Sequence, residues 1–99
     1  FYMTYISKPV VYHDQFVEWL HTTFSDWTED DVNDVLEFLL DYSECGSYVE
    51  IHFVGNDEDL SICDEDEFEI FSNINRVYAE LRKFFCYTDY KSMLVCCDW

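Results

Sequence analysis

The clearest pattern in the chain is an apolar stripe downstream of Thr28. Its members recur three and four residues apart, the spacing of one face of an α-helix. Thr28 is a good N-cap residue, and Asp31 stands three positions later in a variant of the capping box. We therefore predict a helix that begins after Thr28 and ends near Cys45–Gly46. The stripe consists of Val32, Val35, Leu36, Leu39 and Leu40.

Two more helices are predicted, one on each side of this stripe. Residues 14–24 repeat hydrophobic side chains at helical spacing, from Phe16 to Phe24. A longer helix follows Asp64, which we place at the N-cap with Glu67 as its capping-box partner. Its hydrophobic positions are Phe68, Phe71, Ile74, Val77, Tyr78, Leu81 and Phe85.

Other segments favour strands. Residues 2–12 are rich in Tyr, Ile and Val, residues 48–54 alternate between apolar and polar side chains, and residues 92–97 are apolar. Residues 55–59 are typical of a turn, so residues 60–63 are predicted as a return strand. The order is β-α-α-β-β-α-β, which indicates one α+β domain over residues 1–99, with three helices packed on a small antiparallel sheet.

Charge changes this picture of an ordinary small domain. The 99 residues hold 22 Asp and Glu against 5 Lys and Arg, a formal net charge of −17. Residues 1–75 contain 19 of these acids and one cation, Lys8. A net charge beyond roughly 8 in magnitude destabilises a small domain by self-repulsion. Aromatic residues make up 20% of the chain, so we expect it to fold rather than remain disordered.

Four carboxylates follow one line of the predicted second helix. Asp30, Asp34, Glu37 and Asp41 fall at i, i+4, i+7 and i+11, opposite the apolar stripe. Like charges at this spacing cost a few tenths of a kcal/mol per pair, and no Lys or Arg is interleaved. The ordinary interpretation is a solvated helix face. The alternative is a row of anions that a basic, phosphate-binding surface can accept. Residues next to this row that we also assign to the partner-binding surface are Asp26, Glu29 and the aromatic Trp27.

A second acidic cluster surrounds the start of the long helix. Carboxylates at a helix N-terminus gain from the helix dipole and the unpaired N–H groups, but one or two meet that need. Eight within 13 residues exceed it, so we assign this cluster to the same partner-binding surface, extended by Glu50. The eight are Asp57, Glu58, Asp59, Asp64, Glu65, Asp66, Glu67 and Glu69.

Other chemistry finds little support in the sequence. The EF-hand calcium pattern fails because Ile62 stands where glycine is required and Phe68 where the bidentate Glu is required. The His and Cys residues share no metal-ligand spacing, and the two glycines cannot build a phosphate loop. The five cysteines lack the regular spacing of a disulfide framework, which is typical of proteins in a reducing cytosol. No apolar segment is long enough to be predicted as a membrane span. We expect a cytoplasmic protein with no cofactor, metal or catalytic activity.

A compact chain with dense carboxylates, few cations and many aromatics resembles phage-encoded DNA-mimic inhibitors. These include uracil-DNA glycosylase inhibitors, anti-restriction proteins of the Arn type and anti-CRISPR proteins. The resemblance lies in overall character and in no motif. It implies a protein of the host cytoplasm that occupies the basic nucleic-acid-binding groove of a host defence or repair protein, with anti-restriction or anti-CRISPR targets favoured. It also implies that two copies can associate to lengthen the charged surface.

The partner is then a DNA- or RNA-binding protein, and we expect no direct binding to nucleic acid or membranes. The alternative function is an acidic adapter or antitoxin-like protein that binds a basic surface unrelated to DNA. In that case aromatic anchors should contribute more to binding than the carboxylates do.

Overall fold

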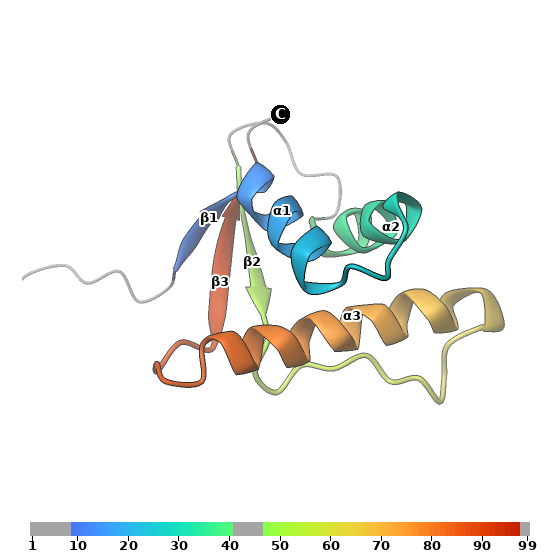
Figure 1. Cartoon of the computed structure of the whole chain (residues 1–99). Coiled ribbons are helices and arrows are strands. Elements are labelled where there is room, and N and C mark those ends of the chain that lie inside the picture. Colours follow the sequence, from blue (N-terminus) through green and yellow to red (C-terminus); the bar gives the residue numbers. More distant parts are fainter. Residues whose placement is uncertain (1–8, 41–46, 98–99) are drawn as a thin grey trace, which may run out of the picture.

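A three-stranded sheet and three helices form the part of the chain, residues 9–40 and 47–97, that this computed structural model describes (Figure 1). The predicted α+β class, with three helices packed on a small sheet, is confirmed. The elements in chain order are β1 (Val10–Tyr12), α1 (His13–Thr23), α2 (Glu29–Leu40), β2 (Tyr48–His52), α3 (Glu65–Phe84) and β3 (Ser92–Cys96).

The sheet has the order β1-β3-β2, so the last strand of the chain lies at its centre. β2 pairs antiparallel with β3, with Val49 opposite Val95 and Ile51 opposite Met93. β1 pairs parallel with β3, with Val11 opposite Val95. The sheet is therefore mixed, which corrects the expectation of an antiparallel one. Parallel pairing is possible here because a long connection, including all three helices, separates β1 from β3.

Residues 60–63, predicted as a return strand, form no strand. Residues 53–64 instead run as a loop along α3 (Figure 1). The guanidinium of Arg82 fixes the beginning of this loop by donating to the carbonyl oxygen of Phe53 at 2.7 Å. β3 occupies the position beside β2 that the return strand was expected to fill.

The predicted N-cap positions of α2 and α3 are confirmed. Of the two capping boxes predicted there, only that of α2 forms. The Thr28 N–H donates to Asp31 Oδ2 at 3.0 Å, and the Asp31 N–H donates to Thr28 Oγ1 at 3.2 Å. At the start of α3, the Asp64 side chain makes no capping hydrogen bond, and its backbone carbonyl accepts the N–H of Glu67 at 3.0 Å. The predicted end of α2 near Cys45–Gly46 lies outside the described residues.

One face of the sheet packs against the helices. Val95 at the sheet centre and Ile51 on β2 are buried, whereas Tyr12 and Tyr48 on the opposite face are exposed. The predicted apolar faces of the helices supply the remaining core. Its fully buried side chains are Phe16, Leu20, Val32, Val35, Leu40, Ile51, Phe53, Ile74, Val77, Val95 and Cys97. Within residues 9–40 and 47–97, no helix combines the length and apolar character needed to cross a membrane.

Candidate acidic interaction surface

α2 packs along the N-terminal half of α3, away from the sheet (Figure 1). Phe38, near the end of α2, meets Phe71 of α3 edge to face, with ring centroids 5.4 Å apart. Just before α2 begins, the Trp27 ring lies 5.5 Å from the guanidinium of Arg76, further along α3. The two helices therefore run in opposite directions, and the acidic residues of α2 between Asp31 and Glu37 come close to those of α3 between Asp66 and Glu69.

A groove of about 280 Å³ lies between the two helices. We call it the α2–α3 groove. Its lining combines carboxylates from both helices with three apolar side chains, which we call its apolar floor. Its lining residues are Asp34, Glu37, Phe38, Glu67, Ile70 and Phe71.

A smaller hollow of about 150 Å³ adjoins the groove, because both are lined by Asp34 and Ile70. Its lining is more polar and includes the amide of Asn73. Together the two hollows bring six carboxylates from two separate segments into one surface, which we call the acidic surface. These six residues are Asp31, Asp34, Glu37, Asp66, Glu67 and Glu69.

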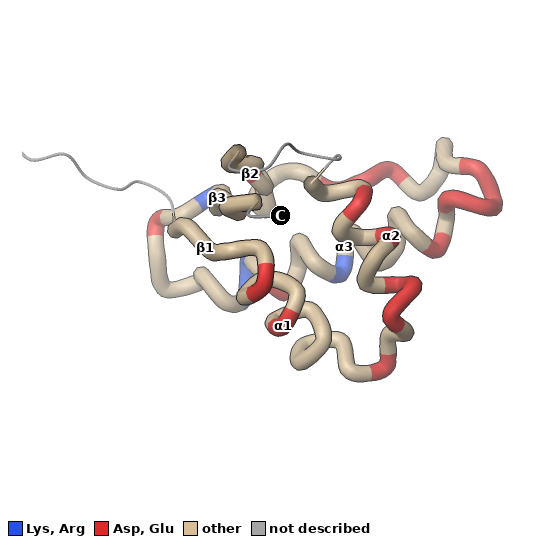
Figure 2. The backbone as a smooth tube through the Cα atoms, turned by 90° about the horizontal axis from the view of Figure 1, so that it is seen from above, with Lys and Arg blue, Asp and Glu red and all other residues tan. Residues whose placement is uncertain are grey.

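Positive charge lies elsewhere in the described part of the chain. The acidic positions concentrate over α2, the N-terminal half of α3 and the loop before it, whereas Lys and Arg lie over the rest of α3 and beside the sheet (Figure 2). Among the residues that the structure describes, no Lys or Arg lines either hollow. The described cations are Arg76, Arg82, Lys83 and Lys91.

The predicted row on α2 lies only partly in the acidic surface. Asp34 and Glu37 line the α2–α3 groove, and Asp30 is exposed but lines neither hollow. Glu29 is exposed in the first turn of α2. Asp41 lies outside the described residues.

The predicted second cluster divides into three parts, of which two lie on α3 and its N-cap and the third on the loop before it. Asp66, Glu67 and Glu69 face α2 across the two hollows. Asp64, at the N-cap, and Glu65, in the first turn, are exposed at the tip of α3 and line neither hollow.

The loop carboxylates Asp57, Glu58 and Asp59 lie along α3 and do not line either hollow. Asp57 pairs with Arg82, with 3.3 Å between Oδ1 and Nη1. The Ser61 hydroxyl and N–H both donate to Asp59 Oδ1, at 2.6 and 2.9 Å, and these hydrogen bonds hold the pKa of Asp59 below its usual value. The carboxylates of Asp57 and Asp59 thus have internal partners that the sequence did not indicate.

Glu50 and Asp26 also interact within the chain. Glu50 accepts a hydrogen bond from the Ser92 hydroxyl at 2.8 Å and lies 3.2 Å from His52 Nε2. Asp26 lies 3.9 Å from Arg76 Nη2. Neither residue lines the two hollows.

Trp27, which the sequence suggested as an aromatic anchor for a partner, is in the core. Its ring is 9% exposed and stacks on Phe24 with centroids 4.1 Å apart. The guanidinium of Arg76 covers both rings, and the buried indole N–H has no hydrogen-bond partner within the described part of the chain. Because Trp27 stacks on Phe24 and lies under the guanidinium of Arg76, its ring is not part of the exposed surface.

Sequence reasoning missed two features of the acidic surface. Asp31 was recognised only as a capping residue, yet it also lines the smaller hollow. Phe38 was not selected, although it lies off the apolar stripe of α2 and is 39% exposed. A large apolar residue beside Glu37 on the charged side of a helix was the signal available in the sequence.

No group of three or more His, Cys, Asp or Glu side chains in the described ranges is arranged to hold a metal ion. The carboxylates of the acidic surface come from two helices, and three of them line the α2–α3 groove together with apolar side chains. This arrangement suits contact with an extended cationic surface.

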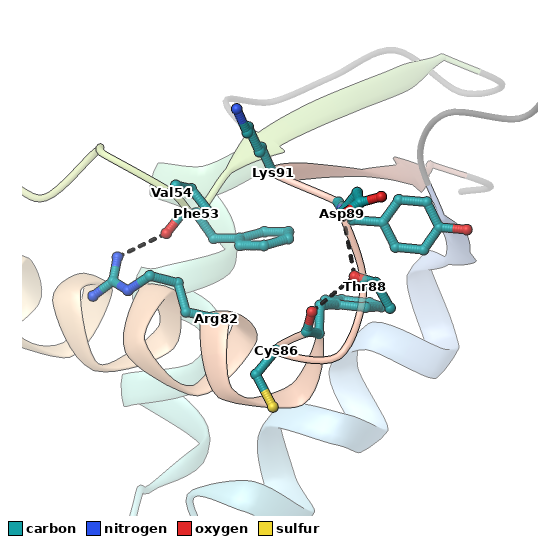
Figure 3. A pocket seen from close by; sticks show the side chains of 9 residues that line it. Phe53, Val54, Arg82, Cys86, Thr88, Asp89 and Lys91 are labelled. Carbon is teal, nitrogen blue, oxygen red and sulfur yellow. Dashed lines mark hydrogen bonds between the residues drawn. The ribbon is translucent and has the colours of Figure 1, made fainter.

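Another cavity, of about 610 Å³, lies at the opposite end of α3 (Figure 3). Two of its polar side chains form hydrogen bonds with backbone carbonyls of the protein. Arg82 binds the Phe53 carbonyl, and the Thr88 hydroxyl donates to the Phe85 carbonyl at 2.7 Å. The side chains of Lys91 and Cys86 point away from the middle of the cavity (Figure 3).

Comparison with known proteins gives no match to a family model, to a curated protein or to a solved structure.

Proposed function

We propose that this chain is a binding protein that uses its acidic surface to occupy the basic nucleic-acid-binding groove of another protein, as a mimic of DNA. The observation that carries the proposal is the convergence of six carboxylates, from α2 and α3, on two adjoining hollows that none of the described Lys and Arg residues lines.

Electrostatics supports this function. Two rows of like charge brought together repel each other and lower the stability of the fold. A cationic partner relieves this repulsion and is attracted over a distance of about 10 Å at ordinary salt. Neighbouring carboxylates along α2 are about 4.5–6 Å apart along the helix axis, a separation comparable to the phosphate spacing along a DNA strand. A groove that binds phosphates through Lys and Arg can therefore accept these carboxylates instead.

The partner class follows from this chemistry and from the resemblance in overall character to phage DNA-mimic inhibitors. Restriction, CRISPR and DNA-repair proteins all present basic grooves to nucleic acid, and we favour an anti-restriction or anti-CRISPR role in the host cytoplasm. In this role the chain needs no catalytic group of its own, because occupying the groove is enough to inhibit.

A second candidate function has one observation in its favour. Phe38 and Phe68 are 39% and 51% exposed near the acidic residues of α2 and α3. Exposed aromatics are typical anchors in protein–protein interfaces. They favour an acidic adapter or antitoxin-like protein whose basic partner does not bind DNA.

Competition with DNA separates the two functions. Immobilised chain is incubated with bacterial lysate, and bound proteins are eluted either with a salt gradient or with duplex DNA at low salt. A DNA mimic should retain proteins that both treatments release, because counterions and phosphates compete for the same cations. Retention of the bound proteins in the presence of saturating duplex DNA would contradict mimicry and favour the adapter.

A further inference from the structure

We propose that the α2–α3 groove receives an apolar side chain from a basic amphipathic helix of the partner protein. This inference rests on the proposed function for the positive charge of the partner. It adds the secondary structure that the partner presents and the place where one of its apolar residues binds.

The apolar floor of the groove is the first reason to expect an apolar side chain of the partner there. Phe38, Ile70 and Phe71 form it, and Phe38 is 39% exposed although its ring packs on Phe71. Contact with phosphate-binding cations requires no apolar floor. A hollow of about 280 Å³ with such a floor matches a protruding aliphatic side chain.

The carboxylates that line the groove, which we call its rim, are the second reason, and they indicate a basic amphipathic helix. Asp34 and Glu37 stand on the α2 side and Glu67 on the α3 side. On an amphipathic helix, Lys or Arg residues flank an apolar stripe on both sides, so they meet both rims when the stripe enters the groove. Nucleic-acid-binding proteins often present basic helices, because a helix fits the major groove of DNA.

Charge argues against a second copy of this chain as the occupant. Of the four described cations, Arg76 lies near Asp26 and Arg82 pairs with Asp57. A second copy would also bring its own high negative charge to the groove. The charge of the rim therefore favours a cationic partner of different sequence.

Two synthetic helical peptides of identical composition test the inference. Both contain Leu, Lys and Ala. The striped peptide carries its Leu residues on one face, and the scrambled peptide disperses them. Fluorescence anisotropy at low salt should show about tenfold tighter binding of the striped peptide, since burial of one Leu-sized side chain has an effect of this order.

Variants of the groove floor show whether Phe38 provides this preference. Phe38→Ser should abolish most of the preference for the striped peptide and leave binding of the scrambled peptide unchanged, whereas Phe38→Leu should retain the preference. Phe84→Ser is the matched control, because Phe84 is 64% exposed at the basic end of α3. A preference that survives in folded Phe38→Ser would overturn the inference.

Photocrosslinking provides a test on the unaltered chain, in case Phe38→Ser does not fold. A benzophenone replaces the central Leu of the striped peptide. Crosslinks should fall within residues 34–38 or 67–71, and crosslinks confined to other segments would contradict the inference.

The outcomes also separate this inference from the proposed function. Equal binding of both peptides, weakened when groove carboxylates are neutralised, would overturn the helix-in-groove inference and leave the proposed function standing. Failure of both peptides to bind at low salt would count against both.

Discussion

Asn75 and Glu58 exchange two hydrogen bonds that fasten the acidic loop to α3. The Glu58 N–H donates to Asn75 Oδ1 at 2.7 Å, and Asn75 Nδ2 donates to the Glu58 carbonyl oxygen at 3.0 Å. The side-chain amide of Asn75 thus pairs with the loop backbone as a neighbouring strand would. This clamp keeps Asp57 and Glu58 beside α3 and close to Tyr78.

Replacing Asn75 with Ala should lower the free energy of unfolding by about 1–3 kcal/mol, because two partly buried backbone groups lose their partner. Urea denaturation measures the change. Asn33→Ala is the matched control, since Asn33 is exposed on α2 and Ala favours the helix. Equal unfolding free energies for the two variants would show that the clamp does not hold the loop.

Trp27→Ala should destabilise the fold by about 3–5 kcal/mol, a large part of the stability of a small domain. The reason is the cavity left beside Phe24 and under Arg76. Thermal denaturation checks it, with Tyr87→Ala as the control because Tyr87 is 97% exposed. A melting temperature close to that of the control, together with loss of partner binding, would instead identify Trp27 as an interface residue.

The acidic loop affects the stability of the fold at alkaline pH through the pKa of Tyr78. Burial raises the pKa of Tyr78 above its usual value of 10.0, and the negative charges of Glu58 and Asp57 raise it further. The folded state therefore keeps a proton that the unfolded state loses as the pH exceeds 10.0. This contribution to stability is complete below that pH and is lost as the pH rises through the raised pKa.

Tyr78→Phe should therefore make the free energy of unfolding fall less steeply above pH 10.0 than it does in the wild type. Urea denaturation at several pH values on both sides of this point measures the slope. If both proteins lose stability equally with pH, the Tyr78 phenol is not the group responsible.

Local signals were sufficient to predict the helices. The Thr28–Asp31 capping box and the apolar stripe after it depend on contacts within a few residues, and both appear in α2 as expected. Residues 60–63 could not be placed in this way. Their loop is held by Asn75 and Arg82, which bind backbone groups 17 and 29 residues away in sequence.

The acidic surface was predictable only in part. Both runs of carboxylates were evident along the chain, but the core decides which sides of α2 and α3 face each other. Consequently Asp34 and Glu67 share one groove, whereas Asp57 is paired with Arg82 on the loop. The apolar floor at Phe38 depends on the same helix packing.

The most direct test of the central claim compares two variants with equal net charge. Each neutralises four carboxylates and so raises the formal charge of −17 by four. The surface variant carries Asp34→Asn, Glu37→Gln, Glu67→Gln and Glu69→Gln. The control variant carries Asp14→Asn, Glu18→Gln, Glu80→Gln and Asp89→Asn.

The measurement is inhibition of DNA binding by a protein captured on the wild-type chain, followed by fluorescence anisotropy of labelled duplex DNA. We predict that the control variant inhibits nearly as well as the wild type, whereas the surface variant requires at least about a hundredfold higher concentration, which corresponds to roughly 0.7 kcal/mol for each carboxylate removed. Equal inhibition by the two variants would contradict the claim that the carboxylates between α2 and α3 are the binding site.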